Sequence, residues 1–267
     1  MKAPKFPDAG IVFLGFSRHN REPIVAILTG INGSSTNKKT GPMAQLWIIR
    51  SDMSPVRAIF FGKDDAICFG CKLRGTPTTK SEFRKLRRML KDRVCYVTMK
   101  APQSIWRKFK AGKYPMLNPA DVAAYLRSQG RTIRLGAYAE PVALPVDLLD
   151  TLTSGGRHTG YTHEWRTTPE YRHLLNASVD TVAEALEAQR LGWRYFRTRF
   201  ADDPLLPGEI ACPASDEAGH RTNCADCTLC DGSRGPQDRR RNLAIIIHGS
   251  NKANFIKVIR RDGTVAA

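Results

Sequence analysis

Residues 118–136, Asn118-Pro-Ala-Asp-Val-Ala-Ala-Tyr-Leu-Arg-Ser-Gln-Gly-Arg-Thr-Ile-Arg-Leu-Gly136, contain a helix signal followed directly by a strand signal. Asn118 suits the N-cap of a helix, Pro119 suits its first position, and Gly130 ends it. Thr132–Gly136 is a short apolar run of the kind found in buried strands. This stretch therefore predicts one helix-then-strand repeat of an α/β fold.

The same alternation continues along residues 93–200. We expect strands and helices at Val94–Val97, Gln103–Ala111, Val146–Leu152, His158–Thr162, Leu174–Ser178, Val182–Leu191 and Trp193–Phe196. Short connections between alternating helices and strands require a parallel sheet with right-handed crossovers. The short apolar strands are typical of strands buried on both faces. We expect a TIM-like (β/α) barrel, complete or degenerate, because no glycine-rich dinucleotide loop follows any strand.

The remaining segments are assigned around this repeat. Residues 1–56 are expected to form a β-rich segment that packs on the barrel. Residues 57–267 are expected to form the barrel-like domain, including a cysteine-rich loop at 212–235. Further strands are expected at Ala58–Phe61, Glu209–Ala211 and Leu243–Ile247, with an edge strand in the tail from Asn254.

The charge balance indicates a polyanionic partner. The chain has 42 Lys and Arg against 25 Asp and Glu, a formal net charge of +17. Such an excess favours binding to nucleic acid, although a basic surface also occurs without such a partner. Candidate phosphate contacts lie in a glycine-rich loop (Lys38, Lys39), on one basic helix (Arg84, Lys85, Arg87, Arg88) and in one arginine run (Arg239, Arg240, Arg241). The loop and the run are equally compatible with solvated surfaces.

The sequence also predicts the compartment. The N-terminal residues lack an apolar core, and no window approaches the ~20 apolar residues that a membrane span needs. We therefore expect a cytoplasmic protein with no membrane contact. In a reducing compartment, clustered cysteines favour metal binding over disulfides.

Two groups of cysteines are candidates for metal binding. Cys212, Cys224, Cys227 and Cys230 fall within nineteen residues, and the last three follow a C-x2-C-x2-C pattern. Such spacing suits zinc or a [4Fe–4S] cluster, and thiolate ligands alone do not decide between them. The polar loop around these cysteines has no core of its own, so we expect the metal to order it. A smaller set, Cys68, Cys71 and Cys95, would need a fourth ligand of another kind.

Residues that follow the strands should share one edge of the fold, where active sites of α/β proteins lie. The set includes acids, cysteines and histidines in numbers that solubility does not explain: Asp64, Asp65, Cys68, Tyr138, Glu140, His163, Glu164, Ser178, Asp180, Arg199, Cys212 and His248. Asp180 precedes a helix and is better explained as its cap. The others are candidates for catalysis or ligand binding.

Several strings resemble a group of phage-encoded proteins across roughly residues 30–250: Asn37–Gly41, Cys68-x2-Cys71, Cys95-Tyr96, Arg134–Pro141, Tyr161-Thr162, Cys212–Ser215, the Cys224–Cys230 pattern and His248-Gly249. Some proteins of this kind resemble deazaguanine DNA transglycosylases, distant relatives of the tRNA-guanine transglycosylases. The resemblance implies a TIM-like barrel, a zinc site and a carboxylate nucleophile, in the cytoplasm of an infected bacterial host. It also implies exchange of guanine in DNA for a 7-deazaguanine base such as preQ0. These enzymes have Gly-Asp where this chain has Ala139-Glu140, so a glutamate would replace their aspartate.

Base exchange needs a carboxylate to hold the sugar, an acid for the departing guanine, and a pocket for the extruded base. The candidate carboxylates are Glu140, Asp64, Asp65 and Glu164. Tyr138, Tyr161 and Trp165 could stack on the base or simply pack in the core, and Ser178 and His248 are further candidate substrate contacts.

Two other functions fit the same residues. The cysteines suit an Fe–S redox or radical enzyme acting on nucleic acid, although the C-x3-C-x2-C signature of radical enzymes is absent. The charge and the cysteines also suit a zinc-containing protein that binds nucleic acid without catalysis. The inserted base, the choice between DNA and RNA, and the oligomeric state do not follow from the sequence.

Overall fold

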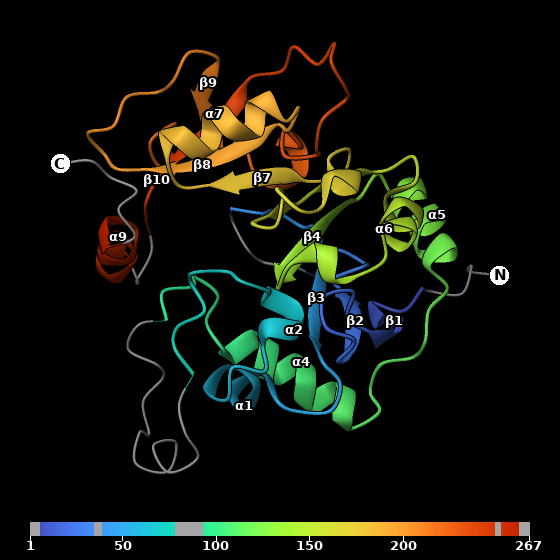
Figure 1. Cartoon of the computed structure of the whole chain (residues 1–267). Coiled ribbons are helices and arrows are strands. Elements are labelled where there is room, and N and C mark those ends of the chain that lie inside the picture. Colours follow the sequence, from blue (N-terminus) through green and yellow to red (C-terminus); the bar gives the residue numbers. More distant parts are fainter. Residues whose placement is uncertain (1–5, 35–38, 78–92, 249–251, 262–267) are drawn as a thin grey trace.

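The computed structural model describes residues 6–34, 39–77, 93–248 and 252–261. Within these ranges the chain forms a mixed α/β fold with two five-stranded sheets (Figure 1). The first sheet lies in the N-terminal half and the second in the C-terminal half. The predicted α/β class is confirmed, and both sheets contain parallel strands.

The first sheet has the strand order β1-β2-β3-β4-β5. Its strands are β1 (Ala9–Phe16), β2 (Pro23–Thr29), β3 (Ala44–Arg50), β4 (Thr132–Tyr138) and β5 (Arg157–Thr159). The pairs β1–β2 and β2–β3 are antiparallel, and the pairs β3–β4 and β4–β5 are parallel. The segment up to residue 56 is therefore β-rich, and it extends the sheet through the pairing of β3 with β4.

The second sheet is parallel throughout, with the order β6-β7-β8-β10-β9. Its strands are β6 (Tyr161–Thr162), β7 (Asn176–Val179), β8 (Tyr195–Arg199), β9 (Glu209–Ala211) and β10 (Asn242–Ile246). Strand β10 lies between β8 and β9, so the last two strands reverse the chain order.

A single residue, Gly160, separates β5 of the first sheet from β6 of the second. Its carbonyl accepts a hydrogen bond from the N–H of Asn176 at 3.0 Å, so the pairing with β7 begins here. A Cβ at this position would lie 2.4 Å from Leu175 Cδ2 and 3.1 Å from Leu135 Cβ. Only glycine fits between these two core leucines without a shift of the neighbours.

The expected helices between the parallel strands are present. They are α5 (Pro119–Ser128), α6 (Val146–Thr153) and α7 (Val182–Arg190), with the 3-10 turns η1 (Pro141–Ala143) and η2 (Pro169–Tyr171). Asn118 caps α5 as predicted, because its side chain accepts hydrogen bonds from the N–H groups of Ala120 and Asp121. Figure 1 shows α5 and α6 beside β4, and α7 over β8.

Three predicted strands are wrong. Residues 58–61 belong largely to helix α1 (Pro55–Phe60), which Ser54 caps and Pro55 opens, so local capping outweighs the apolar run. Val94–Val97 has no regular structure. The tail forms helix α9 (Lys252–Arg261) rather than an edge strand. The remaining helices are α2 (Asp65–Cys68), α4 (Lys100–Lys110) and α8 (Cys224–Cys227).

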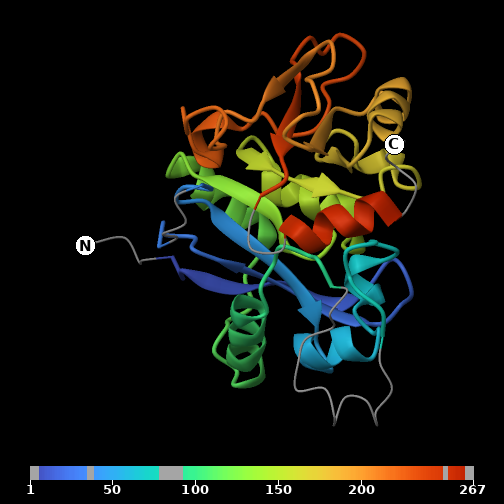
Figure 2. The same cartoon turned by 90° about the vertical axis from the view of Figure 1, so that its left-hand side faces the viewer.

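Helix α9 connects the C-terminal residues to the middle of the molecule. Its Val258 and Phe255 pack with Leu73 and Val94, next to Cys71 and Cys95. In Figure 2, α9 (red) lies between the blue strands of the N-terminal half and the orange C-terminal segments. Within the described ranges, no helix is long and apolar enough to cross a bilayer.

We predict that Gly160→Ala lowers the free energy of unfolding by about 1–3 kcal/mol, because the added methyl group overpacks the contact with Leu175 and Leu135. Urea denaturation monitored by circular dichroism measures the change. Gly156→Ala is the matched control, since its Cβ would meet nothing closer than 3.7 Å. Equal stability of the two variants would show that the junction of the sheets tolerates a side chain.

Candidate functional site

One face of the parallel strands is polar and partly open. In β4, β7 and β8 the residues on one side are buried, whereas Arg134, Ser178, Phe196 and Thr198 on the other side are partly exposed. Ser178 pairs with Phe196 in register, so their side chains share this face. Parallel sheets are normally covered on both faces. The same face also carries the buried side chains of Thr132, Tyr138 and Asn176, so the expected burial on both faces holds in part, and a ligand could bind only where the cover is incomplete.

Glu140 and His163 meet at the carboxyl edge of this face. Glu140 follows β4, and its N–H donates to the carbonyl of Ile67 at 2.8 Å. His163 follows β6, and its Nδ1 lies 2.6 Å from Glu140 Oε1. The backbone N–H of His163 donates to Glu140 Oε2 at 3.1 Å. The prediction that residues following the strands share one edge is confirmed for this pair.

The pair is strongly coupled electrostatically. Burial lowers the pKa of His163, but the charge and hydrogen bond of Glu140 outweigh burial and raise that pKa to about 9. His163 is therefore an imidazolium at neutral pH. Burial and the charge of Glu140 raise the pKa of the neighbouring Glu164 carboxyl above its usual value. The site thus places Glu140 beside the carboxyl group of Glu164, which holds its proton more tightly than a free glutamate does.

Asp180 completes the acidic group, although the sequence favoured a capping role. Thr181 caps α7 instead, because its hydroxyl accepts from the N–H of Glu184. The Asp180 carboxylate accepts from Thr198 Oγ1 at 2.5 Å and binds Lys72 Nζ at 3.0 Å. The charge of Asp180 raises the pKa of His163, and the charge of Lys72 lowers it. Lys72 was missed because nothing in its local sequence distinguishes it from the other cations of a very basic segment.

Asp64 and Asp65, two predicted catalytic carboxylates, have structural partners. Asp64 is buried and forms an ion pair with Arg74 at 2.6 Å. Asp65 accepts hydrogen bonds from the side chain of Asn20 and from the N–H of Ala66 at the start of α2. The acids that surround His163 are therefore Glu140, Glu164 and Asp180 rather than this pair.

Two of the three aromatic candidates are buried, and one is partly exposed. Trp165 and Tyr138 are 1% and 2% exposed, so they pack in the core and offer no surface to a base. Of the two roles considered for these residues, the burial favours packing in the core. Tyr161 is partly exposed on the polar face, and its ring centroid lies 5.0 Å from that of Phe196. Tyr161 and the partly exposed Ser178 remain candidates for substrate contact.

The first cysteine set lies beside this acidic group. Burial and then the charge of Asp64 raise the pKa of Cys68, with smaller contributions from Cys71, Cys95 and Glu140. Burial and the charge of Glu140 likewise raise the pKa of Cys71. The three thiols are therefore near one another and near Glu140, as the sequence suggested. Any metal ion here would have to displace the thiol protons.

The second cysteine set is held by hydrogen bonds from distant parts of the chain. The N–H groups of Cys224 and Ala225 donate to the carbonyls of Lys39 and Thr40, each at 3.0 Å. The hydroxyl of Thr132 in β4 donates to the carbonyl of Ala225 at 2.9 Å. Gly41 has a φ of 69°, and a Cβ there would lie 2.5 Å from the Asn223 side chain. The glycine-rich loop thus packs closely against the cysteines.

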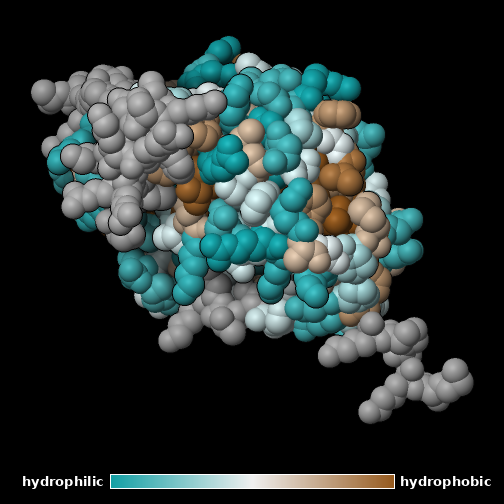
Figure 3. Space-filling model, turned by 90° about the horizontal axis from the view of Figure 1, so that it is seen from below, coloured by the Kyte–Doolittle hydropathy of each residue, from teal (hydrophilic) through white to brown (hydrophobic). Residues whose placement is uncertain are grey.

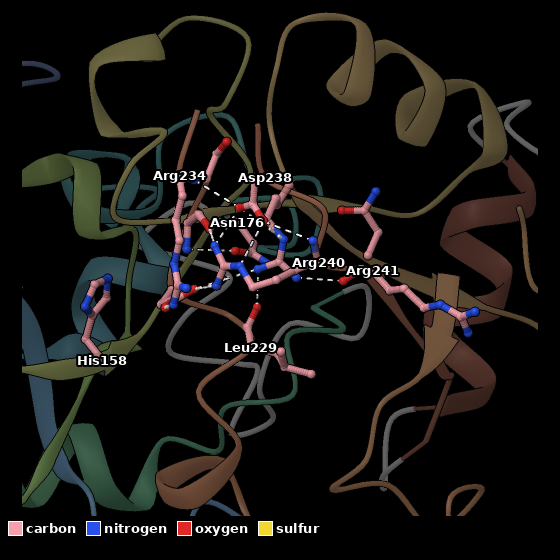
Figure 4. A network of polar contacts seen from close by, with 12 residues as sticks. His158, Asn176, Leu229, Arg234, Asp238, Arg240 and Arg241 are labelled. Atoms are coloured by element: carbon pink, nitrogen blue, oxygen red, sulfur yellow. Dashed lines mark hydrogen bonds and ion pairs between the residues drawn. The ribbon is translucent and has the colours of Figure 1, made fainter. Parts of the chain in front are cut away.

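An ion-pair network anchors the segment that follows these cysteines (Figure 4). Arg240 forms ion pairs with Asp231 and Asp238, and its guanidinium also donates to the carbonyl of Gly232. The N–H of Gly232 donates to Asn176 of β7 at 3.0 Å. These contacts hold the segment that follows the cysteines, and the expectation that metal orders the polar loop around the cysteines stays a prediction.

The same network corrects the role of the arginine run. Arg194, directly before β8, donates to the carbonyls of Leu229 and Arg241, at 2.5 and 2.6 Å. Arg240 forms ion pairs with two aspartates, whereas the side chains of Arg239 and Arg241 are exposed. Arg240 stabilises the loop, and only its two neighbours remain available to a phosphate.

Burial raises the pKa values of Cys212, Cys224 and Cys230. Two cations act in the opposite direction, because Arg134 and Lys39 lower the pKa of Cys224. Arg134 donates to the hydroxyl of Tyr96 at 3.0 Å. In the part of the chain that the structure describes, Arg134 has no carboxylate partner. Positive charge is therefore supplied to this thiol set by β4 and by the glycine-rich loop.

The thiols fit a soft metal ion in their chemistry, and all seven cysteines are free of disulfides. The charges of Cys212, Cys224 and Cys227 all act on Cys230, so the four side chains are near one another. Over the described ranges, however, no three Cys, His, Asp or Glu side chains are arranged to hold a metal ion. Binding would require the thiols to turn toward a common centre.

The remaining candidates are distributed as follows. Lys38, Arg84, Lys85, Arg87 and Arg88 lie outside the described residues. Lys39 Nζ lies 2.9 Å from His248 Nε2, so a predicted phosphate contact and a predicted substrate contact meet each other. They meet beside the second cysteine set.

The chain matches no protein-family model, no curated protein and no solved structure. The function has to be inferred from the site itself.

We predict that Glu140→Gln lowers the pKa of His163 from about 9 toward its usual range near 6.5. The His163 pKa is raised on folding, so its stabilisation is complete below about pH 6.5 and is lost as the pH rises through about 9. Wild-type protein should therefore lose about 3 kcal/mol more than the variant between pH 6 and pH 10. Urea denaturation at both pH values, with NMR titration of the imidazole, measures this difference. A His163 pKa unchanged by the substitution would contradict the pairing.

Proposed function

We propose that this protein exchanges guanine in DNA for a 7-deazaguanine base such as preQ0. The observation that carries the proposal is the Glu140–His163 pair, with Glu164 beside it, at the carboxyl edge of a partly exposed sheet face. Active sites of parallel α/β folds lie at this edge. The resemblance to deazaguanine DNA transglycosylases supports the same assignment, and it places a carboxylate nucleophile at the position of Glu140.

We interpret the fold as a degenerate (β/α) barrel. Strands β3 to β8 are parallel and follow the chain order across Gly160, as the strands of such a barrel do. The arrangement departs from a regular barrel at the end of the second sheet, where β10 pairs with both β8 and β9.

The chemistry follows from the two carboxyl groups. A Glu140 oxygen attacks C1′ of the sugar, forming a C–O bond as the bond from C1′ to the guanine nitrogen breaks. Glu164, whose pKa is raised, gives its proton to the departing guanine. The incoming base then returns its ring proton to Glu164 while its nitrogen attacks C1′, and the C–O bond breaks to release Glu140.

His163 acts through Glu140 in this scheme. Each Glu140 oxygen uses one lone pair to accept a hydrogen bond from His163 and keeps another for attack. The imidazolium fixes the orientation of the carboxylate and stabilises its charge. His163 is therefore a positioning residue, and Glu140 and Glu164 are the reacting groups.

The basic surface of α4 supports a nucleic-acid partner. Pro102, Ile105, Trp106 and Phe109 face the protein, whereas the cations Lys100, Arg107, Lys108 and Lys110 are exposed. None of these four forms an ion pair within the described residues, and α4 contains no acid. In Figure 1, α4 lies at the bottom beside α1, and Figure 3 shows that hydrophilic side chains cover much of this lower face. A row of unpaired cations on a helix matches the phosphate backbone of DNA.

We propose zinc as the metal of Cys212, Cys224, Cys227 and Cys230, with a [4Fe–4S] cluster as the alternative. When bound, zinc would stiffen the loop between β9 and β10, and the reaction above does not require it. A cluster would instead support the second candidate function, a redox enzyme acting on nucleic acid, which the presence of two thiol sets in one chain favours.

We predict that wild-type protein inserts preQ0 into guanine-containing DNA and that Glu140→Gln abolishes insertion, because the amide cannot attack C1′. Glu164→Gln should slow insertion by about 10²–10⁴-fold, as expected for loss of a general acid. Mass spectrometry of the digested nucleosides measures insertion. Glu170→Gln, an exposed residue paired with Arg18, is the control and should be fully active. Full activity of Glu140→Gln, or none in wild type, would refute the proposal.

We predict that Arg107→Gln/Lys108→Gln weakens binding to duplex DNA and flattens its salt dependence. If each side chain contacts one phosphate, the slope of log K against log salt falls by about 2. Fluorescence anisotropy at several salt concentrations measures the slope. Arg157→Gln/Arg190→Gln removes two exposed cations elsewhere and should leave it unchanged. The same slope for both variants would show that α4 does not contact DNA.

A further inference from the structure

Arg134 lies in the middle of β4, on the partly exposed sheet face. Its side chain is partly exposed, whereas those of its neighbours Ile133 and Leu135 are buried. Its guanidinium donates to the hydroxyl of Tyr96 at 3.0 Å, which is its single hydrogen bond in the part of the chain that the structure describes. A guanidinium has several further N–H donors, so most donors of Arg134 are available to a ligand.

The charge of Arg134 has no acidic counter-ion nearby. The side chains of Tyr96, Tyr161 and Cys224 all raise the pKa of Arg134 against the opposing effect of burial, so these three side chains lie close to the guanidinium. None of the three is a carboxylate, and no ion pair of Arg134 occurs among the described residues. Charges that are partly withdrawn from water are normally paired, so an anionic ligand would supply the missing partner.

Two aromatic rings share this face of the sheet. Tyr161 of β6 and Phe196 of β8 are partly exposed, and their ring centroids lie 5.0 Å apart. The hydroxyl of Tyr161 is hydrogen-bonded to the side chain of Cys230, and Phe196 packs against Cys212. Partly exposed rings that are held in place offer a surface on which a base can stack.

The same face continues to the candidate site. Ser178 of β7 pairs in register with Phe196 of β8, and β6 on the other side of β7 leads directly into His163. A strand of nucleic acid that enters beside Glu140 can therefore continue across this face toward Arg134.

We propose that Arg134 binds a phosphate of an unpaired DNA strand, with a neighbouring base stacked on Tyr161 and Phe196. A cation beside exposed aromatic rings is the combination with which proteins hold single strands. Arginine suits a phosphate group because two parallel N–H groups can donate to two of its oxygens. The choice of DNA as the ligand rests on the proposed function, whereas the binding itself requires no base exchange.

The probe for this site is a fluorescent oligodeoxythymidine of about ten nucleotides, which contains no guanine and cannot undergo exchange. Fluorescence anisotropy with the whole protein measures its affinity at several salt concentrations. Arg134→Gln should weaken binding about tenfold or more, as expected for a lost charge-assisted contact. The slope of log K against log salt should fall by about 0.7, the value for one phosphate of a single strand. Arg190→Gln removes an exposed arginine of α7 and should change neither quantity.

Two variants of Tyr161 test the stacking independently of Arg134. Tyr161→Leu should weaken binding about tenfold, as expected for the loss of one contact between a base and an aromatic ring. Tyr161→Phe keeps the ring and loses only the hydroxyl, so it should bind the probe as wild type does. Circular dichroism confirms that each variant is folded, and the Tyr161 pair decides the outcome if Arg134→Gln does not fold.

Three outcomes would overturn the site: unchanged affinity and slope in Arg134→Gln, equal binding by the two Tyr161 variants, or an equally large effect of Arg134→Gln on a duplex of the same length. Loss of bound zinc from Arg134→Gln without loss of oligonucleotide binding would assign Arg134 to the thiolates of the second cysteine set instead. Because the probe lacks guanine, failure of base exchange and failure of this site give different results.

Discussion

The absence of a side chain at Gly160 is the constraint on which the rest of the structure depends. It allows one extended segment to pair with β4 on one side and, one residue later, with β7 on the other. The parallel strands of both halves consequently run side by side with their carboxyl ends in a common direction. Glu140 after β4 then lies within hydrogen-bond reach of His163 after β6, although 22 residues separate them in the chain. The candidate site follows from strand order rather than from any local motif.

The two cysteine sets have different surroundings. The first lies among the acids, and α9 packs against it. The second is tied to the glycine-rich loop, β4, β7 and β8 by backbone hydrogen bonds and by the Arg240 network. These contacts hold the backbone of the loop, whereas its thiols would still have to turn toward a common centre to bind a metal ion.

The sequence predicted the α/β class, most parallel strands and the grouping of residues that follow them, because alternating apolar runs and caps such as Asn118 are local signals. The predictions from sequence were wrong where one local pattern is compatible with two structures. The run at 58–61 is apolar enough for a strand, but Ser54 and Pro55 start a helix. Asp180 resembles a cap, yet Thr181 supplies the hydroxyl and leaves Asp180 to bind Thr198. The meeting of Lys39 with His248, and the pairing of Arg240 with Asp231 and Asp238, depend on tertiary contacts that no spacing encodes.

The central claim is that Glu140 attacks the sugar of a nucleotide in DNA. The most direct measurement is mass spectrometry of the protein after brief incubation with guanine-containing duplex and acid quenching. The account predicts that a DNA strand lacking one guanine becomes attached to the peptide that contains Glu140. An adduct at another residue, or base exchange in wild-type protein with no adduct at all, would contradict it.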